Sequence, residues 1–243
     1  MQFYYLRKLL KKLHRKLFYL SGMKKILSLF CFILLIAFTA QKKKKIIFFG
    51  DSITEQAARQ GGFIAKMDSM LTLKNVKDNY DLVGAGVSGN KIYDLYLRME
   101  DDVLSKNPDV VVIFIGVNDV WHKRTSGTGT DANKFENFYS AILKKLADKN
   151  IKVILCTPAA IGEKTDVSNE LDGDLNKYCN IIRDLSIKNN LPLIDLRKIF
   201  LNYNLKNNPE NKDRGILTSD GVHLNETGNQ LVADEMWKAI SKL

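Results

Sequence analysis

The chain has 243 residues, enough for one sizeable domain with its own core and hardly enough for two. Its formal charge of +10 is concentrated in residues 1–45, which hold 12 of the 37 Lys and Arg and none of the 27 Asp and Glu. The remaining 25 basic and 27 acidic residues nearly cancel, which excludes the basic surface of a nucleic-acid-binding domain.

Residues 1–45 are interpreted as a targeting extension that lies outside the folded domain. Met23-Lys24-Lys25 precedes an uncharged stretch, 26–41, rich in Leu, Ile and Phe, which is typical of a signal peptide. These 16 residues fall short of the ~20 that a membrane-spanning helix usually needs. Lys42–Lys45 follow at once and oppose translocation. We expect export, to a periplasmic or extracellular location, with an uncleaved membrane anchor as the alternative. Translation starts at Met1 or at Met23, and the second is favoured.

The predicted domain, residues 46–243, begins with a buried strand. Four consecutive apolar residues, Ile46–Phe49, run into Gly50, Asp51 and Ser52. An unbroken apolar run of this kind predicts a parallel strand covered on both faces. The glycine permits a tight turn, which would leave Ser52 at the carboxyl edge of a sheet, where open α/β folds bind ligands. Taken alone, Asp-Ser is equally consistent with an ordinary helix cap.

The rest of the chain alternates helices with strands. Apolar residues at helical spacing predict helices over 63–73, 91–106, 133–149 and 169–188, and a last one from Asn225 or Thr227. Apolar runs predict strands over 80–86, 109–115, 152–158 and 191–196. Loops are expected over 54–62, 121–132, 159–168 and 202–219. This alternation predicts a single α/β domain, a three-layer doubly wound sandwich around a five-stranded parallel sheet with flavodoxin-like order.

Four short motifs fall at strand ends or in the last loop. They are GDSIT with Ser52, GVSGN with Gly86, GVND with Asn118, and DGVH with Asp220 and His223. With these blocks in this order, residues 46–240 resemble the SGNH hydrolases, the superfamily of GDSL-type esterases and lipases. The resemblance implies a serine esterase that needs no cofactor, with Ser52, Asp220 and His223 as its catalytic triad. It also implies an oxyanion hole formed by Ser52, Gly86 and Asn118.

The chemistry of these residue types agrees with the resemblance. A serine hydroxyl needs a base within hydrogen-bond reach, and the domain has two histidines, His122 and His223. His223 has Asp220 three residues earlier, which could hold the imidazole in the required tautomer. Attack on an ester creates an oxyanion, which backbone N–H groups and an amide at neighbouring strand ends could stabilise. Without a Cβ, Gly86 would let a substrate oxygen approach its backbone.

Other residues have weaker signals. Trp121 and His122 directly follow the Asn118 motif and could line a substrate pocket, with ordinary loop packing as the alternative. Cys156 and Cys179 are expected as buried thiols and not as a disulfide. No P-loop or metal-ligand pattern is visible.

A competing functional class rests on Gly84, Gly86 and Gly89, which satisfy the dinucleotide fingerprint G-x-G-x-x-G between a strand and a helix. A nucleotide-dependent oxidoreductase would also need an acidic residue at the end of the next strand, and that strand ends in Gly116.

The favoured function is hydrolysis of a small-molecule or glycan ester through an acyl-enzyme, with a short acyl group such as acetyl on a carbohydrate. A lysophospholipase or thioesterase is the alternative within the same family.

Overall fold

The computed structural model describes residues 11–12 and 42–243, and residues 43–243 form one compact unit. Most of the predicted targeting extension, including the stretch 26–41, lies outside the described residues. Within the described part of the chain, no helix is long and apolar enough to cross a membrane.

Five parallel strands form the sheet, in the order β2-β1-β3-β4-β5, which confirms the predicted fold class. The strands are β1 (Lys44–Gly50), β2 (Tyr80–Gly86), β3 (Val110–Phe114), β4 (Lys152–Cys156) and β5 (Leu193–Ile194). β1 begins two residues before the predicted Ile46. The Lys45 N–H donates to Asp109 Oδ2 at 2.8 Å, and the Asp109 N–H donates to the Lys45 carbonyl at 2.9 Å. Backbone pairing between β1 and the start of β3 therefore begins before Ile46, where the apolar run used for the prediction starts.

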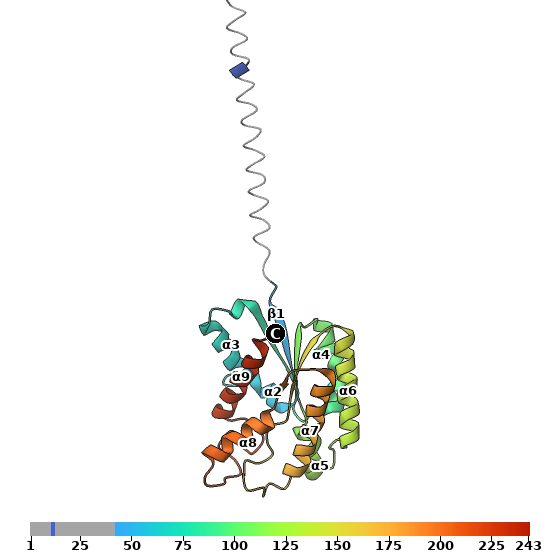
Figure 1. Cartoon of the computed structure of the whole chain (residues 1–243), viewed down its shortest axis with the longest axis vertical. Coiled ribbons are helices and arrows are strands. Elements are labelled where there is room, and N and C mark those ends of the chain that lie inside the picture. Colours follow the sequence, from blue (N-terminus) through green and yellow to red (C-terminus); the bar gives the residue numbers. More distant parts are fainter. Residues whose placement is uncertain (1–10, 13–41) are drawn as a thin grey trace, which may run out of the picture. The chain divides into compact units, whose positions relative to one another are not determined.

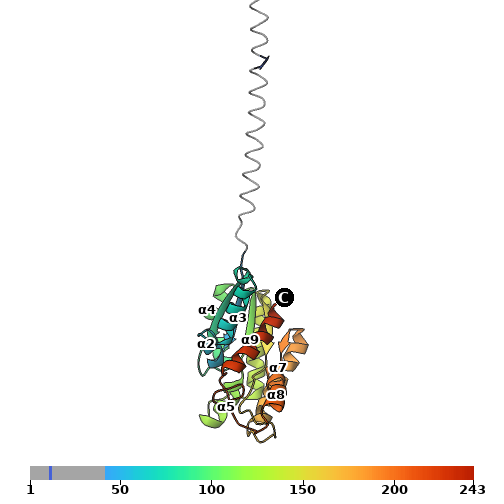
Figure 2. The same cartoon turned by 90° about the vertical axis from the view of Figure 1, so that its left-hand side faces the viewer.

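Helices cover both faces of this sheet (Figure 1). They are α2 (Ser52–Ala57), α3 (Phe63–Leu73), α4 (Ile92–Asp102), α5 (Val117–Thr125), α6 (Ala132–Asp148), α7 (Asp172–Asn189), α8 (Leu196–Asn207) and α9 (Glu226–Ile240). Short 3₁₀ turns occupy Lys77–Asn79 and Leu104–Lys106. Helices α3, α8 and α9 lie on one face, and α4, α6 and α7 lie on the other (Figure 1). In the view turned by 90°, α3 and α9 face the viewer (Figure 2).

The sheet supplies one wall of each of two hydrophobic cores. In β1, Ile46 and Phe48 pack into the core shared with α3 and α9, while Ile47 and Phe49 pack into the core shared with α4 and α6. All four side chains are 0–1% exposed. Alternating side chains of one strand therefore enter opposite cores, which explains why the run is apolar at every position.

Three helices replace predicted loops or extend into them. α2 occupies the start of the predicted loop 54–62, because the Asp51 side chain accepts from the Ile53 N–H and caps a short helix. α5 begins four residues before the predicted loop 121–132 and covers its first five residues. α8 reaches into 202–219 and starts within the predicted fifth strand, which shrinks to two residues. Its cap, Asp195, looked like part of an extended run in the sequence.

The strand order places a topological switch between β1 and β3. The chain continues from β1 to β2 on one side of the sheet, and from β3 to β4 on the other. The loops that follow β1 and β3 then diverge and leave a crevice at the carboxyl edge, which is where open α/β sheets bind ligands. Ser52 lies just after β1 and Asn118 lies just after β3, so both flank this crevice.

Candidate active site

Ser52, His223 and Asp220 form a continuous chain of hydrogen bonds. Ser52 Oγ lies 2.9 Å from His223 Nε2, although 171 positions separate the two residues in the sequence. His223 Nδ1 lies 2.7 Å from Asp220 Oδ2. The other carboxylate oxygen of Asp220 accepts from the backbone N–H of His223 at 2.7 Å, so the acid and the imidazole are held in one rigid turn. The arrangement is that of a hydroxyl, a base and an orienting acid.

The charge state of Asp220 sets the tautomer of His223. Partial burial of Asp220 opposes its ionisation, but hydrogen bonds from the His223 ring and backbone outweigh this and hold the pKa of the carboxyl below its usual value. At neutral pH Asp220 is therefore ionised and accepts from Nδ1–H. The Nε2 lone pair of His223 then faces the Ser52 hydroxyl, which is the orientation that a general base requires.

Gly86 and Asn118 lie at the ends of the strands on either side of β1. Asn118 is in the first turn of α5, is 3% exposed, and donates from Nδ2 to the Asn90 carbonyl at 3.1 Å. Its amide group has a second N–H that this bond does not use.

Gly86 is the last residue of β2, and a Cβ there would lie 2.1 Å from the backbone nitrogen of Glu55 in α2. The close packing of α2 on β2 therefore requires this glycine. The reason predicted from the sequence, close approach of a substrate oxygen, is not needed to explain it.

Two acidic side chains are buried next to the site. Asp51 is 1% exposed, and burial raises its pKa to about 7 even though Oδ1 accepts from the Ile53 N–H. Burial likewise raises the pKa of Asp119 to about 6. Because the folded state favours the protonated carboxyl, Asp51 contributes to stability at low pH. This contribution is lost as the pH rises from 3.8, the ordinary pKa of the group, through about 7. Near neutral pH, Asp51 is partly uncharged and repels a developing anion less than an ionised carboxylate would.

A buried glutamate that the sequence analysis missed holds the loop that carries Asp220 and His223. We call residues 216–224 the Asp-His loop. Glu163 is 1% exposed and accepts from the backbone N–H groups of Ile216, Leu217 and Thr218 at 2.8, 2.6 and 2.8 Å. A carboxyl with three backbone donors fixes the start of this loop. In the sequence, Glu163 is one acidic residue in a polar segment after a strand. No local pattern indicated that its partners would be backbone groups of a distant loop.

The Asp-His loop also has internal bonds. The Ser219 N–H donates to the His223 carbonyl at 2.8 Å, and Thr218 and Leu224 form an isolated antiparallel bridge. Gly221 has φ of +96°, a conformation that favours glycine, and its carbonyl accepts from the Gly162 N–H at 2.9 Å. The loop is therefore closed on itself and joined to the segment that contains Glu163.

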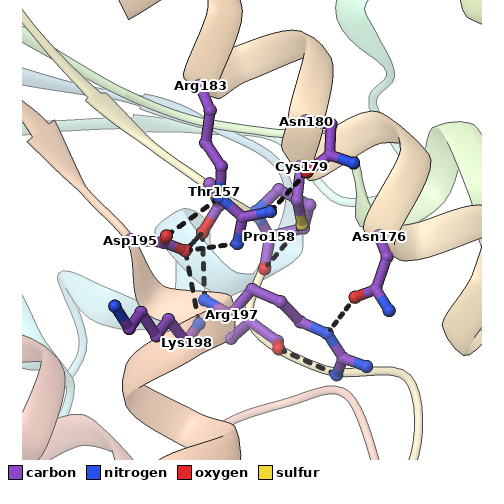
Figure 3. A network of polar contacts seen from close by, with 10 residues as sticks. Thr157, Pro158, Asn176, Cys179, Asn180, Arg183, Asp195, Arg197 and Lys198 are labelled. Atoms are coloured by element: carbon purple, nitrogen blue, oxygen red, sulfur yellow. Dashed lines mark hydrogen bonds and ion pairs between the residues drawn. The ribbon is translucent and has the colours of Figure 1, made fainter.

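A second polar cluster anchors that segment to α7 and α8 (Figure 3). Arg197 is 7% exposed and donates to Asp172 at 2.6 Å, to Asn176 at 2.8 Å and to the Ala159 carbonyl at 3.5 Å. Asp195 accepts two bonds from Arg183, at 2.8 and 2.9 Å. Because Arg197 contacts the backbone just after β4, the cluster supports the position of Glu163 and, through it, of the Asp-His loop.

Trp121 and His122 lie one helical turn after Asn118 on α5. Both are partly buried, and their ring centroids are 5.8 Å apart. A Cβ added to Gly89 would lie 3.9 Å from His122 Cε1, so His122 borders the loop that follows β2. Burial and the nearby Lys91 lower the pKa of His122, which favours a neutral ring at neutral pH. Both residues thus follow Asn118 by one turn of the same helix, and His122 also borders the loop after Gly86.

The arrangement around β2 does not fit the dinucleotide fingerprint. β2, which contains Gly84 and Gly86 and is followed by Gly89, is an edge strand, whereas the switch point of this sheet lies between β1 and β3. Within the described residues, no group of three or more His, Cys, Asp or Glu side chains could hold a metal ion. Cys156 and Cys179, also in the described part, are free and buried.

Comparison with known proteins gives consistent matches. Residues 48–231 match the model of the GDSL-like lipase/acylhydrolase family. The crystal structure of an acetyl xylan esterase, AlAXEase, is 69% identical, covers 81% of this chain and 99% of its own, and superposes with a TM-score of 0.80. An acetylxylan esterase of Geobacillus stearothermophilus is 28% identical over an alignment of 173 residues, and the match covers 65% of this chain and 78% of that protein. An isoamyl acetate-hydrolyzing esterase 1 homolog of Homo sapiens is 25% identical over an alignment of 222 residues, and the match covers 82% of each chain.

The fold, the hydrogen-bonded Ser-His-Asp chain and these similarities define a carboxylic ester hydrolase. The chain belongs to the GDSL-like lipase/acylhydrolase family, within the SGNH hydrolases, as its four motifs indicated.

The role of Glu163 can be tested by the variant Glu163→Gln. Its amide must turn an N–H₂ group toward one of the backbone donors, so we expect the free energy of unfolding to fall by about 1–3 kcal/mol. The start of the Asp-His loop should also loosen, which lowers kcat several-fold. Thermal unfolding and steady-state kinetics measure the two effects.

Glu170→Gln is the matched control, because Glu170 is 77% exposed and makes a surface ion pair with Arg124. Its effect on stability should stay within about 0.5 kcal/mol. Equal losses in the two variants would contradict the special role of Glu163.

Proposed function

We propose that this protein removes short acyl groups, acetyl above all, from carbohydrates. Ser52 is the nucleophile, His223 is the general base and Asp220 orients the imidazole. The observation that carries this proposal is the continuous hydrogen-bond chain from Asp220 through His223 to Ser52, at 2.7 and 2.9 Å. The oxyanion hole consists of the Ser52 and Gly86 N–H groups and the Asn118 amide.

The reaction proceeds in two displacements. Ser52 Oγ attacks the ester carbonyl carbon while its proton passes to His223 Nε2, and negative charge develops on the carbonyl oxygen. The oxyanion donors stabilise that charge. Collapse of the tetrahedral intermediate breaks the ester C–O bond, and His223 returns its proton to the departing alcohol. Water then attacks the acyl-enzyme with His223 again as base, which releases the acid and restores Ser52.

The substrate class rests on the relatives and on the borders of the site. Two of the relatives are named for acetylated xylan and a third for isoamyl acetate. The relative at 69% identity covers 81% of this chain and 99% of its own. Trp121 and His122, one turn beyond Asn118, offer ring surfaces that suit packing against a sugar, and both are proposed substrate contacts.

Substitution of the triad tests the mechanism. Ser52→Ala and His223→Ala should each lower kcat by roughly 10⁴-fold or more, with the fold intact, because each removes a group that acts on the reacting atoms. Asn118→Ala should lower kcat by about 10²- to 10³-fold with little change in KM. Hydrolysis of p-nitrophenyl acetate and far-UV circular dichroism are the measurements. Ser105→Ala, an exposed serine, is the control and should behave as the parent.

Acyl preference tests the substrate class. Across p-nitrophenyl esters of two, four, eight and twelve carbons, kcat/KM should be highest for acetate and should fall steadily with chain length. Acetate release from acetylated xylo-oligosaccharides extends the measurement to a carbohydrate. A maximum at eight or twelve carbons would instead favour the lysophospholipase or thioesterase alternative.

The extension before the domain has a proposed role of its own. Residues 1–45 would direct export, and the hydrolase domain would comprise 46–243, with β1 extending back to Lys44. The composition of 26–41 supports this proposal. Amino-terminal sequencing of the native protein should find a start near Gln41 in the fraction outside the cytoplasm. A product that starts at Met1 or Met23 and remains with the membrane would show an uncleaved anchor.

A further inference from the structure

Arg98, on α4, spans the carboxyl ends of β1 and β2. Its Nη2 donates to the carbonyl of Gly50, the last residue of β1, at 2.7 Å, and to the carbonyl of Ala85, in β2, at 3.0 Å. Its Nε donates to the side-chain oxygen of Asn90 at 2.6 Å. Nη1 pairs with Asp102 at 2.5 Å on the outer side, and the Arg98 side chain is only 18% exposed.

Each inner contact of Arg98 reaches a group next to a proposed oxyanion donor. The Ala85 carbonyl and the Gly86 N–H belong to the same peptide unit. Asn90, whose side chain Arg98 holds, presents the backbone carbonyl that accepts from the Asn118 amide at 3.1 Å. The Gly50 carbonyl stands at the end of the strand that leads into Ser52. One guanidinium therefore touches the supports of all three donors.

We propose that Arg98 is a positioning residue for the oxyanion hole, which it sets by holding the ends of β1 and β2 and the Asn90 loop in one geometry. This inference rests on the proposed function, because it takes Ser52, Gly86 and Asn118 as the donors. Arg98 itself does not touch the reacting atoms.

Two physical effects follow from these contacts. A cationic donor on the Ala85 carbonyl polarises the peptide unit, which makes the Gly86 N–H a stronger donor to a developing anion. The bonds to β1 and β2 also fix the distance between the strand ends, so the donors need not reorganise during the reaction. Arginine suits both tasks because its planar fork donates in several directions at once, whereas lysine offers a single point charge. The Phe49 ring, 4.6 Å from the Arg98 guanidinium carbon, restrains that plane.

The test uses the full chain with Arg98→Met, which keeps an unbranched apolar stem and removes the guanidinium donors. We expect kcat for p-nitrophenyl acetate to fall about 10- to 100-fold, with KM within about twofold of the parent. Assays run well below the unfolding temperature, so that a lower stability alone does not change kcat. Arg98→Lys should recover only part of the loss, because it restores the charge and not the fork.

A double-mutant cycle of Arg98 and Asn118 distinguishes a positioning role of Arg98 from a merely structural one. If Arg98 acts partly through Asn118, then Arg98→Met should cost clearly less in the Asn118→Ala background than in the parent. Asn90→Ala, which removes the acceptor of Nε and keeps both strand carbonyls, should give an intermediate loss of kcat. Asp102→Asn is the matched control, because it weakens only the outer ion pair, and its kcat should stay within about twofold of the parent.

The possible outcomes distinguish a failure of the Arg98 inference from a failure of the proposed function. A folded Arg98→Met protein with kcat within twofold of the parent, while Ser52→Ala is inactive, would overturn this inference and leave the proposed function intact. A rise in KM at constant kcat would also overturn it, since Arg98 would then contact the substrate. If Arg98→Met does not fold, unchanged kcat in both Arg98→Lys and Asn90→Ala would overturn it. Turnover retained by Ser52→Ala would instead reject the proposed function.

Discussion

The parallel register of β1 with its two neighbours is the constraint on which the site depends. Gly50 pairs with Gly86 on one side and with Phe114 on the other, so three strands end at the same level. Ser52, Gly86 and Asn118 lie within a few residues of this level. A one-residue slip of β2 or β3 would move its side chains to the wrong core and carry its proposed oxyanion donor away from Ser52. Packing of the two cores thus also aligns the site.

Buried polar side chains then tie the loops to this edge. Glu163 holds the Asp-His loop, and Arg197 holds the segment that carries Glu163. Arg98 does the same for the ends of β1 and β2. Burying such groups is costly unless every strong donor or acceptor finds a partner, and here the partners are mainly backbone atoms. Polar groups can therefore position loops that have no regular secondary structure of their own.

One proposed oxyanion donor and both proposed substrate contacts lie on one short helix. α5 carries Asn118 in its first turn and Trp121 and His122 in its second. Its N-cap is Gly116, at φ of +125°, two residues after the end of β3. With the proposed roles of these residues, a change that shifts α5 would alter the stabilisation of the transition state and the contacts to the substrate together.

The sequence by itself determined the fold class and named the residues of the candidate site. Ile46–Phe49 and 109–115 are apolar at every position, which only a doubly covered strand explains, and the motifs around Ser52, Gly86, Asn118 and His223 are local in the chain. Tertiary structure decided what local patterns do not contain. Glu163 acts on backbone atoms 53–55 positions away and Arg98 on a carbonyl 48 positions away, so neither role leaves a periodic or compositional signal. The helices α2, α5 and α8 escaped prediction for a related reason, because their first residues look like a turn or, in α8, the end of a strand until caps and buried faces hold them.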